Sequence, residues 1–148
     1  MALTQIYTIG FAKKSAEEFF GRLRQHRIQL LVDVRLHNTS QLAGFTKKAD
    51  LSYFLREILG AQYLHEPMLA PTEELLRDYQ KGRISWAEYE RSFLELLRQR
   101  QVEKHIPKDL FAKPTVLLCS EYAADYCHRR LVAEYLAEKW GSVDIIHL

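Results

Sequence analysis

Four short runs of apolar and β-branched residues, spread along the whole chain, most constrain the fold. They occupy residues 6–9, 30–34, 115–118 and 143–148, each bounded by polar or turn-forming residues. A short, near-continuous apolar run is typical of a strand buried on both faces, as in a parallel sheet. A weaker run at residues 62–65 follows Gly60 and is the candidate for a fifth strand.

The stretches between these runs carry helical signals. Ser15 with Glu18, and Ser85 with Glu88, have the spacing of a capping box and predict helix starts at both serines. A third helix is expected to begin near Thr46 and to end near Gly60. The last helix carries one apolar stripe and is expected to stop at Gly141. These predictions are drawn from residue spacing alone.

Residues 67–113 contain no convincing strand, and their large apolar residues recur at helical spacing. We expect two helices here that cover the sheet, with a lid over a site as the alternative. The element order is then β-α-β-α-β, further helices, and β-α-β. This order predicts an α/β, single-domain three-layer fold over residues 1–148, with a mostly parallel sheet of about five strands flanked by helices.

Composition narrows the functional class. The 148 residues include 21 Lys and Arg against 19 Asp and Glu, so the net charge of +2 does not by itself indicate a polyanion partner. The first ten residues lack the features of a secretory signal, and no run approaches a membrane span, so we expect a cytoplasmic protein without a membrane partner. The two cysteines are then free thiols.

Unusual polar residues follow the predicted strands. Gly10 ends the first run, Asp33 and Arg35 end the second, and Cys119 and Glu121 follow the third long run. In open parallel sheets the ligand crevice lies outside the carboxyl ends of the strands. We therefore expect these residues to meet at one edge of the sheet.

The stretch VLLCSEYAADYCHRR, residues 116–130, runs from a strand into a helix. Asp125 is the expected N-cap, which places Cys127 and His128 in the first turn and Arg129 just behind. The free N–H groups and the helix dipole favour an anion there and lower the pKa of a thiol, so Cys127 is a candidate nucleophile.

Each of these residues also has a structural interpretation. Cys127 and His128 extend an apolar helical stripe and fit a core position equally well. Cys119 ends an apolar strand, where a buried, inert thiol is the ordinary finding. Asp33 and Arg35 fit an internal ion pair, although a carboxylate at the end of a buried run is costly without a partner.

The motifs IYTIGF, LLVDVR, GFTKKADLSYFL and LLCSEYAADYCHRRLVAEYL, in this order, resemble the domain of unknown function 488 family over residues 6–148. The resemblance implies a small bacterial or archaeal α/β protein with a parallel sheet and a polar pocket. The positions matching the family motifs are Gly10, Asp33, Arg35, Ser40, Phe45, Cys119, Glu121, Cys127, His128 and Arg129. Asn38 and Gln41 depart from the family pattern, in place of a proline and an arginine.

Motif and resemblance together give one predicted site. The predicted catalytic residues are Asp33, Glu121, Cys127 and His128. The predicted substrate-binding residues are Gly10, Arg35, Ser40, Cys119 and Arg129. No paired CxxC or HExxH spacing occurs, and no metal ligand or cofactor is predicted. A rhodanese or tyrosine phosphatase loop, Cys-x5-Arg, is not matched after Cys119, because Asp125 stands at the arginine position.

Three functions remain open. The first is an enzyme on a phosphorylated or other anionic substrate, with Arg35 and Arg129 holding the anion and Asp33 or Glu121 acting as acid or base. The second is a nucleic-acid-associated protein or cation-dependent hydrolase, in which Asp33 and Glu121 hold a divalent cation and lysines around the crevice contact phosphates. The third is a non-catalytic module that binds a small anion. The oligomeric state is left open.

Overall fold

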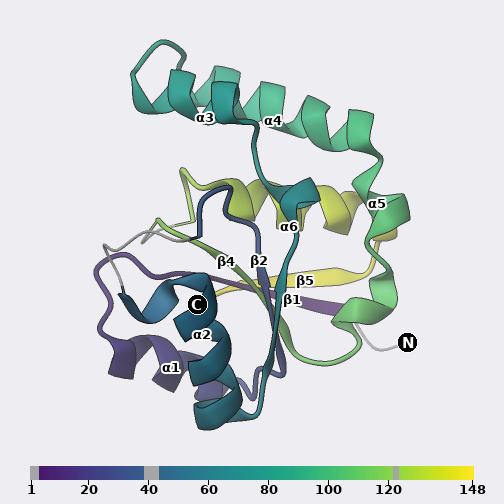
Figure 1. Cartoon of the computed structure of the whole chain (residues 1–148). Coiled ribbons are helices and arrows are strands. Elements are labelled where there is room, and N and C mark those ends of the chain that lie inside the picture. The colour runs from purple at the N-terminus through teal and green to yellow at the C-terminus, as the bar shows by residue number, and fades with distance from the viewer. Residues whose placement is uncertain (1–3, 39–43, 122–123) are drawn as a thin grey trace.

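The computed structural model describes residues 4–38, 44–121 and 124–148, and its centre is a five-stranded sheet (Figure 1). All strand pairs are parallel, and the strand order is β3-β2-β4-β1-β5. The strands are β1 (Thr4–Gly10), β2 (Leu30–Asp33), β3 (Gln62–His65), β4 (Thr115–Cys119) and β5 (Val143–His147). The α/β class, the parallel sheet and the weak fifth strand are confirmed.

Six α-helices connect the strands within the described residues. They are α1 (Ala16–Gln25), α2 (Lys48–Phe54), α3 (Glu73–Gln80), α4 (Trp86–Arg100), α5 (Val102–His105) and α6 (His128–Trp140). The Ser15 and Ser85 side chains accept the predicted capping hydrogen bonds from the backbone N–H groups of Glu18 and Glu88. After α2 the chain continues in a π-helical turn, Leu55–Leu59, to Gly60, whose φ of 64° suits a residue without a Cβ.

Two helix starts differ from the prediction. Thr46 ends a short 3-10 helix, Gly44–Thr46, and the extended backbone of Lys47 precedes α2. The last helix begins at His128 with Cys127 at the N-cap, two residues after the expected Asp125. The reason is a tight turn in which the Cys127 N–H donates to the Ala124 carbonyl at 3.2 Å, so Cys127 keeps an extended backbone and the helix begins after it.

The helices form layers on both faces of the sheet (Figure 1). Successive side chains of a strand point to opposite faces of the sheet. In β2, Leu31 therefore lies on the face covered by α1 and α2, and Val32 lies on the face covered by α6. The α4 helix packs mainly against α6, and α3 packs against α4. Residues 67–113 thus form two principal helices as predicted, but α3 lies outside the layer that touches the sheet.

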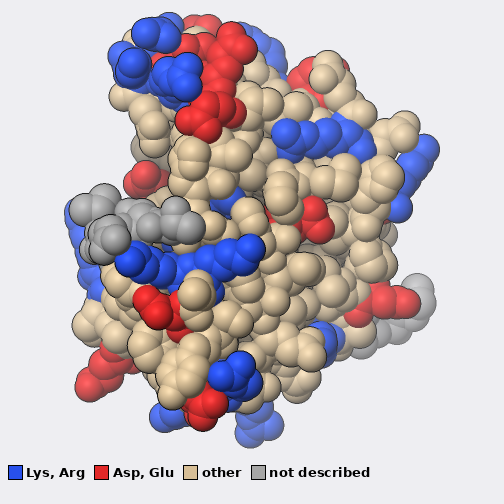
Figure 2. All heavy atoms as spheres, viewed as in Figure 1, with Lys and Arg blue, Asp and Glu red and all other residues tan. Residues whose placement is uncertain are grey.

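In the described parts of the chain, no helix combines the length and apolarity that a membrane span requires. Figure 2 shows basic side chains beside acidic ones on the face in view. Of the basic residues expected around the crevice, Lys14 and Arg35 are buried rather than displayed on the surface.

Candidate functional site

A pocket of about 250 Å³ opens near the carboxyl ends of β2 and β4, where the sequence placed a site. Its residues come from the strand ends, from the α3–α4 hairpin and from the start of α6. They are Phe11, Arg35, His37, Leu76, Tyr79, Gln80, Trp86, Tyr89, Cys119, Ser120, Glu121, Tyr126, Cys127 and His128. The pocket has one polar side and one aromatic side, a combination typical of sites for small molecules.

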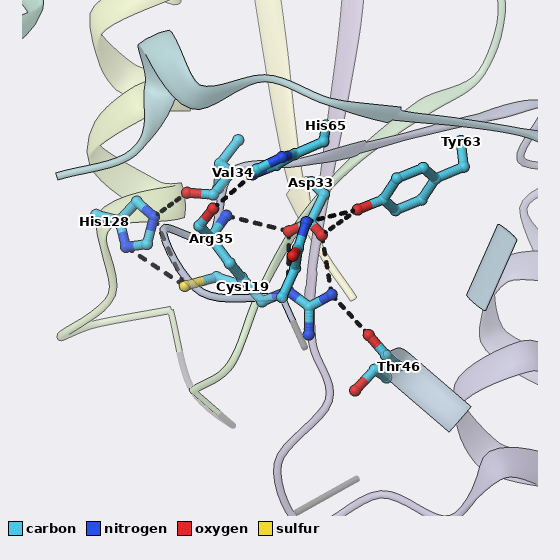
Figure 3. Close-up of polar contacts among 9 residues, drawn as sticks. Asp33, Val34, Arg35, Thr46, Tyr63, His65, Cys119 and His128 are labelled. Atoms are coloured by element: carbon cyan, nitrogen blue, oxygen red, sulfur yellow. Dashed lines mark hydrogen bonds and ion pairs between the residues drawn. The ribbon is translucent and has the colours of Figure 1, made fainter. Parts of the chain in front are cut away.

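Cys119 and His128 form the polar floor of this pocket. The sulfur of Cys119 lies 3.4 Å from Nδ1 of His128, and both residues are buried. The other ring nitrogen, Nε2, lies 2.6 Å from the carbonyl oxygen of Val34 (Figure 3). Because a carbonyl only accepts hydrogen bonds, Nε2 must carry the proton, which leaves Nδ1 unprotonated. The sulfur lies beside the ring, 3.4 Å from Nδ1 and 3.9 Å from Nε2.

The surroundings of Cys119 favour its thiolate. Burial raises the pKa of this thiol, but a hydrogen bond from Cys127, the backbone N–H groups of Ser120 and Glu121, and the positive charge of Arg129 together lower it further than burial raises it. The net direction is a pKa below the ordinary thiol value. The strand-to-helix junction therefore favours the charged form of the Cys119 sulfur.

Cys127 behaves in the opposite way. Burial, and then its hydrogen bond to Cys119 and the negative charge there, raise the pKa of the Cys127 thiol well above the ordinary value, and His128 offsets only part of this. The expected lowering at the helix N-terminus is therefore wrong, because desolvation and the neighbouring sulfur outweigh the helix dipole. Of the two cysteines, Cys119 is the one placed to be an anion.

A second polar cluster surrounds Asp33, which has no exposed surface. Arg35 binds both carboxylate oxygens, through Nε and a terminal nitrogen at 2.8 Å each, and also donates to the Thr46 carbonyl at 2.6 Å. The Tyr63 hydroxyl donates to the same carboxylate at 2.6 Å (Figure 3). The desolvation of Tyr63 and its hydrogen bond to Asp33 raise the pKa of the phenol. Asp33 and Arg35 thus satisfy each other as a buried ion pair.

The two clusters lie on opposite faces of the sheet edge. Asp33 has the same parity along β2 as Leu31 and points toward α2, whereas Cys119 shares the α6 face with Leu117. The backbone carbonyl of Val34 links the two clusters. Val34 lies in the chain between Asp33 and Arg35, and its carbonyl accepts the hydrogen bond of His128. Asp33 therefore supports the strand end from behind and does not line the pocket.

Arg129 and Gly10 hold the loop that carries Glu121. One terminal nitrogen of Arg129 donates to the Glu121 carbonyl at 2.7 Å, and its Nε contacts the Thr8 hydroxyl at 3.3 Å. Gly10 lies directly under this carbonyl, where a Cβ would collide with it. The Arg129 side chain is buried against β1 and is not part of the pocket lining.

The structure thus divides the predicted site. The residues that line the pocket are Arg35, Cys119, Glu121, Cys127 and His128. Asp33, Gly10 and Arg129 lie behind its wall and position it. Ser40 and Gln41 lie outside the described residues. Phe45 packs with the α1 face of the core, in edge contact with Phe19 and Phe20.

Sequence reasoning missed the aromatic side of the pocket. Tyr79, Trp86 and Tyr89 contact one another with ring centroids 5.0 to 5.4 Å apart, and Tyr126 meets Trp86 edge to face at 5.5 Å. Their helical spacing signalled a buried face, but only the α3–α4 hairpin brings that face over the strand ends. The α3–α4 hairpin therefore forms one wall of the pocket. This position resembles the alternative prediction, in which residues 67–113 form a lid over a site.

Fold and site together define an α/β protein with a parallel sheet and a thiol–imidazole cluster at its strand ends. The family model described as "Domain of unknown function DUF488" matches residues 15–136, and the chain belongs to this family. Searches of curated proteins and of solved structures gave no match.

Proposed function

We propose that the protein is an enzyme that acts on a small anionic molecule in this pocket, with Cys119 and His128 at its reactive centre. The carrying observation is the 3.4 Å contact between the Cys119 sulfur and the unprotonated Nδ1 of His128 at the pocket floor. An ordered thiol–imidazole contact in a concave, largely apolar site is the arrangement that cysteine enzymes use.

The hydrogen bond to Val34 fixes what His128 does. Because the Nε2–H group donates to that carbonyl, the lone pair of His128 is on Nδ1. Nδ1 can accept a proton from the Cys119 thiol, or it can donate its electron pair to a bound group, as the sulfur can. In both cases the reactive atoms face the same small volume. Cys127, whose pKa is raised, remains a protonated donor to Cys119.

An anionic substrate is favoured by the charges around the floor. The α6 helix begins at His128, so its positive end points at the pocket. Arg35 also lines the β2 side, where Asp33 neutralises its charge. Glu121 is the one acidic residue among the described lining residues and stands at the exposed edge. A small molecule with one carboxylate or phosphate fits this distribution.

Alkylation of the two thiols tests the proposal with matched probes. Iodoacetate carries a carboxylate and iodoacetamide does not, so the ratio of their rates at Cys119, divided by the same ratio for glutathione, measures the pocket's preference for an anion. In buffer with EDTA we expect Cys119 to be labelled before Cys127, with a relative preference for iodoacetate of about tenfold. The control is Cys127→Ser, which keeps Cys119 as the single thiol.

Two results oppose the proposal. Labelling of both cysteines only upon unfolding places them in an inert core. Labelling of Cys119 without any preference for iodoacetate removes the anionic substrate. A non-catalytic anion-binding module predicts protection of the thiols by inorganic phosphate together with slow labelling. No contact among the described residues favours the nucleic-acid alternative, and both oxygens of Asp33 are committed to protein donors.

A further inference from the structure

We propose that Cys119, Cys127 and His128 hold a zinc ion at the floor of the pocket, with the fourth coordination position open to the substrate. This inference rests on the proposed function, because it names the cofactor of the same reactive centre. It makes Cys127 a ligand of the reactive centre, in addition to its role as a donor to Cys119.

The three candidate ligand atoms lie close to one another. The two sulfurs and a ring nitrogen of His128 lie within 4.8 Å of one another. With Zn–S of about 2.3 Å and Zn–N of about 2.1 Å, two sulfurs bound to one zinc ion are roughly 3.8 Å apart and a sulfur and a nitrogen roughly 3.6 Å apart. The observed 3.4 Å between Cys119 and His128 nearly matches the second value.

His128 also makes the hydrogen bond that is typical of a metal-binding histidine. Such a residue donates its non-ligating N–H to a carboxylate or a carbonyl, which fixes the tautomer and the ring orientation. The Nε2–H of His128 does this with Val34 at 2.6 Å. The unprotonated Nδ1 is the ring nitrogen nearer to the Cys119 sulfur, at 3.4 Å against 3.9 Å for Nε2, so an ion on Nδ1 requires the sulfur to move toward the lone pair.

The three side chains are 2% to 8% exposed, and each contributes to the pocket wall. Three protein ligands with one position facing a cavity is the arrangement of catalytic zinc sites, whereas structural sites are closed by four. Two soft sulfurs and one imidazole select zinc over magnesium or calcium, which prefer oxygen ligands.

The charges balance when the ion binds. Zinc binds both sulfurs as thiolates, so Cys127 loses its proton and Cys119 loses any proton that it still holds; the ion with two thiolates and a neutral imidazole has no net charge. In such a site, the ion's fourth position is where the anionic group of a small substrate would bind. The Cys127 thiol then becomes a ligand, and the ion replaces its hydrogen bond to Cys119.

Cobalt substitution tests the site by a readout that does not need the substrate. Co²⁺ added to the chelator-treated protein should give a thiolate-to-cobalt charge-transfer band and tetrahedral bands in the visible, saturating at one ion per chain. Cys119→Ser and Cys127→Ser should each lower the charge-transfer band by about half or more, because each removes one of two thiolates. His65→Asn is the matched control, because His65 also contacts a backbone carbonyl, that of Arg35, without a sulfur beside it.

The wild-type protein provides a second measurement if a serine variant fails to fold. One equivalent of Zn²⁺ should release the proton of Cys127 and slow iodoacetamide labelling of both cysteines by about tenfold or more. Absence of the charge-transfer band, or equal labelling with and without Zn²⁺, overturns the metal site.

The two proposals fail separately. Preferential labelling of Cys119 by iodoacetate in EDTA, without any cobalt band, overturns the zinc site and leaves the anion-binding enzyme standing. A saturating cobalt band that both serine variants weaken, without any preference for iodoacetate in the chelator-treated protein, supports the metal site and overturns the anionic substrate.

Discussion

A Cβ placed on Gly10 would lie 1.5 Å from the carbonyl oxygen of Glu121, far inside any tolerated contact. This carbonyl also accepts the hydrogen bond of Arg129. The last residue of β1 therefore supports the loop that carries the pocket's acidic residue, and the loop can keep its position only while Gly10 has no side chain.

Gly10→Ala should lower the free energy of unfolding by about 3 kcal/mol, at the upper end of the range for overpacking, because backbone has to move. Gly21→Ala is the matched control. It lies within α1 with nothing within 4 Å of the added methyl group, and should stabilise by about 0.5–1 kcal/mol through helix propensity. Denaturant unfolding measures both, and a cost below 1 kcal/mol at Gly10 would show that the contact is not tight.

Asp33→Asn should destabilise the protein by about 3–5 kcal/mol, because it leaves the buried guanidinium of Arg35 without its anion. Asp78→Asn removes the corresponding partner from the more exposed pair with Arg83 and should cost about 1 kcal/mol or less. The comparison uses chemical denaturation at neutral pH. Similar costs for the two variants would mean that the Asp33 pair is solvated.

The hydrogen bond from the Tyr135 hydroxyl to Glu103, at 2.7 Å, predicts a stability difference that depends on pH. It lowers the pKa of Glu103, and burial with this bond raises the pKa of Tyr135 to about 12. Tyr135→Phe should cost about 1 kcal/mol at neutral pH.

The sign follows from linkage. A lowered carboxyl pKa gives stability that is present above the ordinary value of 4.5 and is lost as the pH falls through the folded value. A raised phenol pKa gives stability that is lost as the pH rises from 10 toward about 12. The difference between wild type and Tyr135→Phe should therefore shrink at both ends, whereas Tyr53→Phe, at an exposed position, should show no such profile.

Much of the fold was predictable because each strand is marked by local composition. The apolar runs gave all the strands of the sheet to within about two residues, and Ser15 and Ser85 gave two helix starts. The strand order was not predictable, because the insertion of β4 between β2 and β1 depends on packing between distant segments. The N-cap at Cys127 was missed for a similar reason, since the turn before it overrides the capping preference of Asp125.

The candidate site was predicted in location more than in detail. The strand-end rule brought Cys119, Glu121 and His128 to one pocket. It did not reveal that side-chain alternation turns Asp33 to the opposite face, nor that the α3–α4 hairpin contributes Trp86 and Tyr89 to the wall. The C-x7-C-H spacing of the sulfur–imidazole cluster matches no familiar paired motif, so its convergence became visible only in three dimensions.

The measurement that most directly tests the account is the tautomer of His128, read from long-range ¹⁵N–¹H correlations of the imidazole ring. It should be made in EDTA at mildly alkaline pH, where an imidazole is ordinarily neutral. The account predicts a proton on Nε2, held by the Val34 carbonyl, and an Nδ1 that is protonated only when it has taken the proton of Cys119. A neutral ring with its proton on Nδ1 and none on Nε2 would contradict it, because His128 could then neither donate to Val34 nor accept the thiol proton through Nδ1.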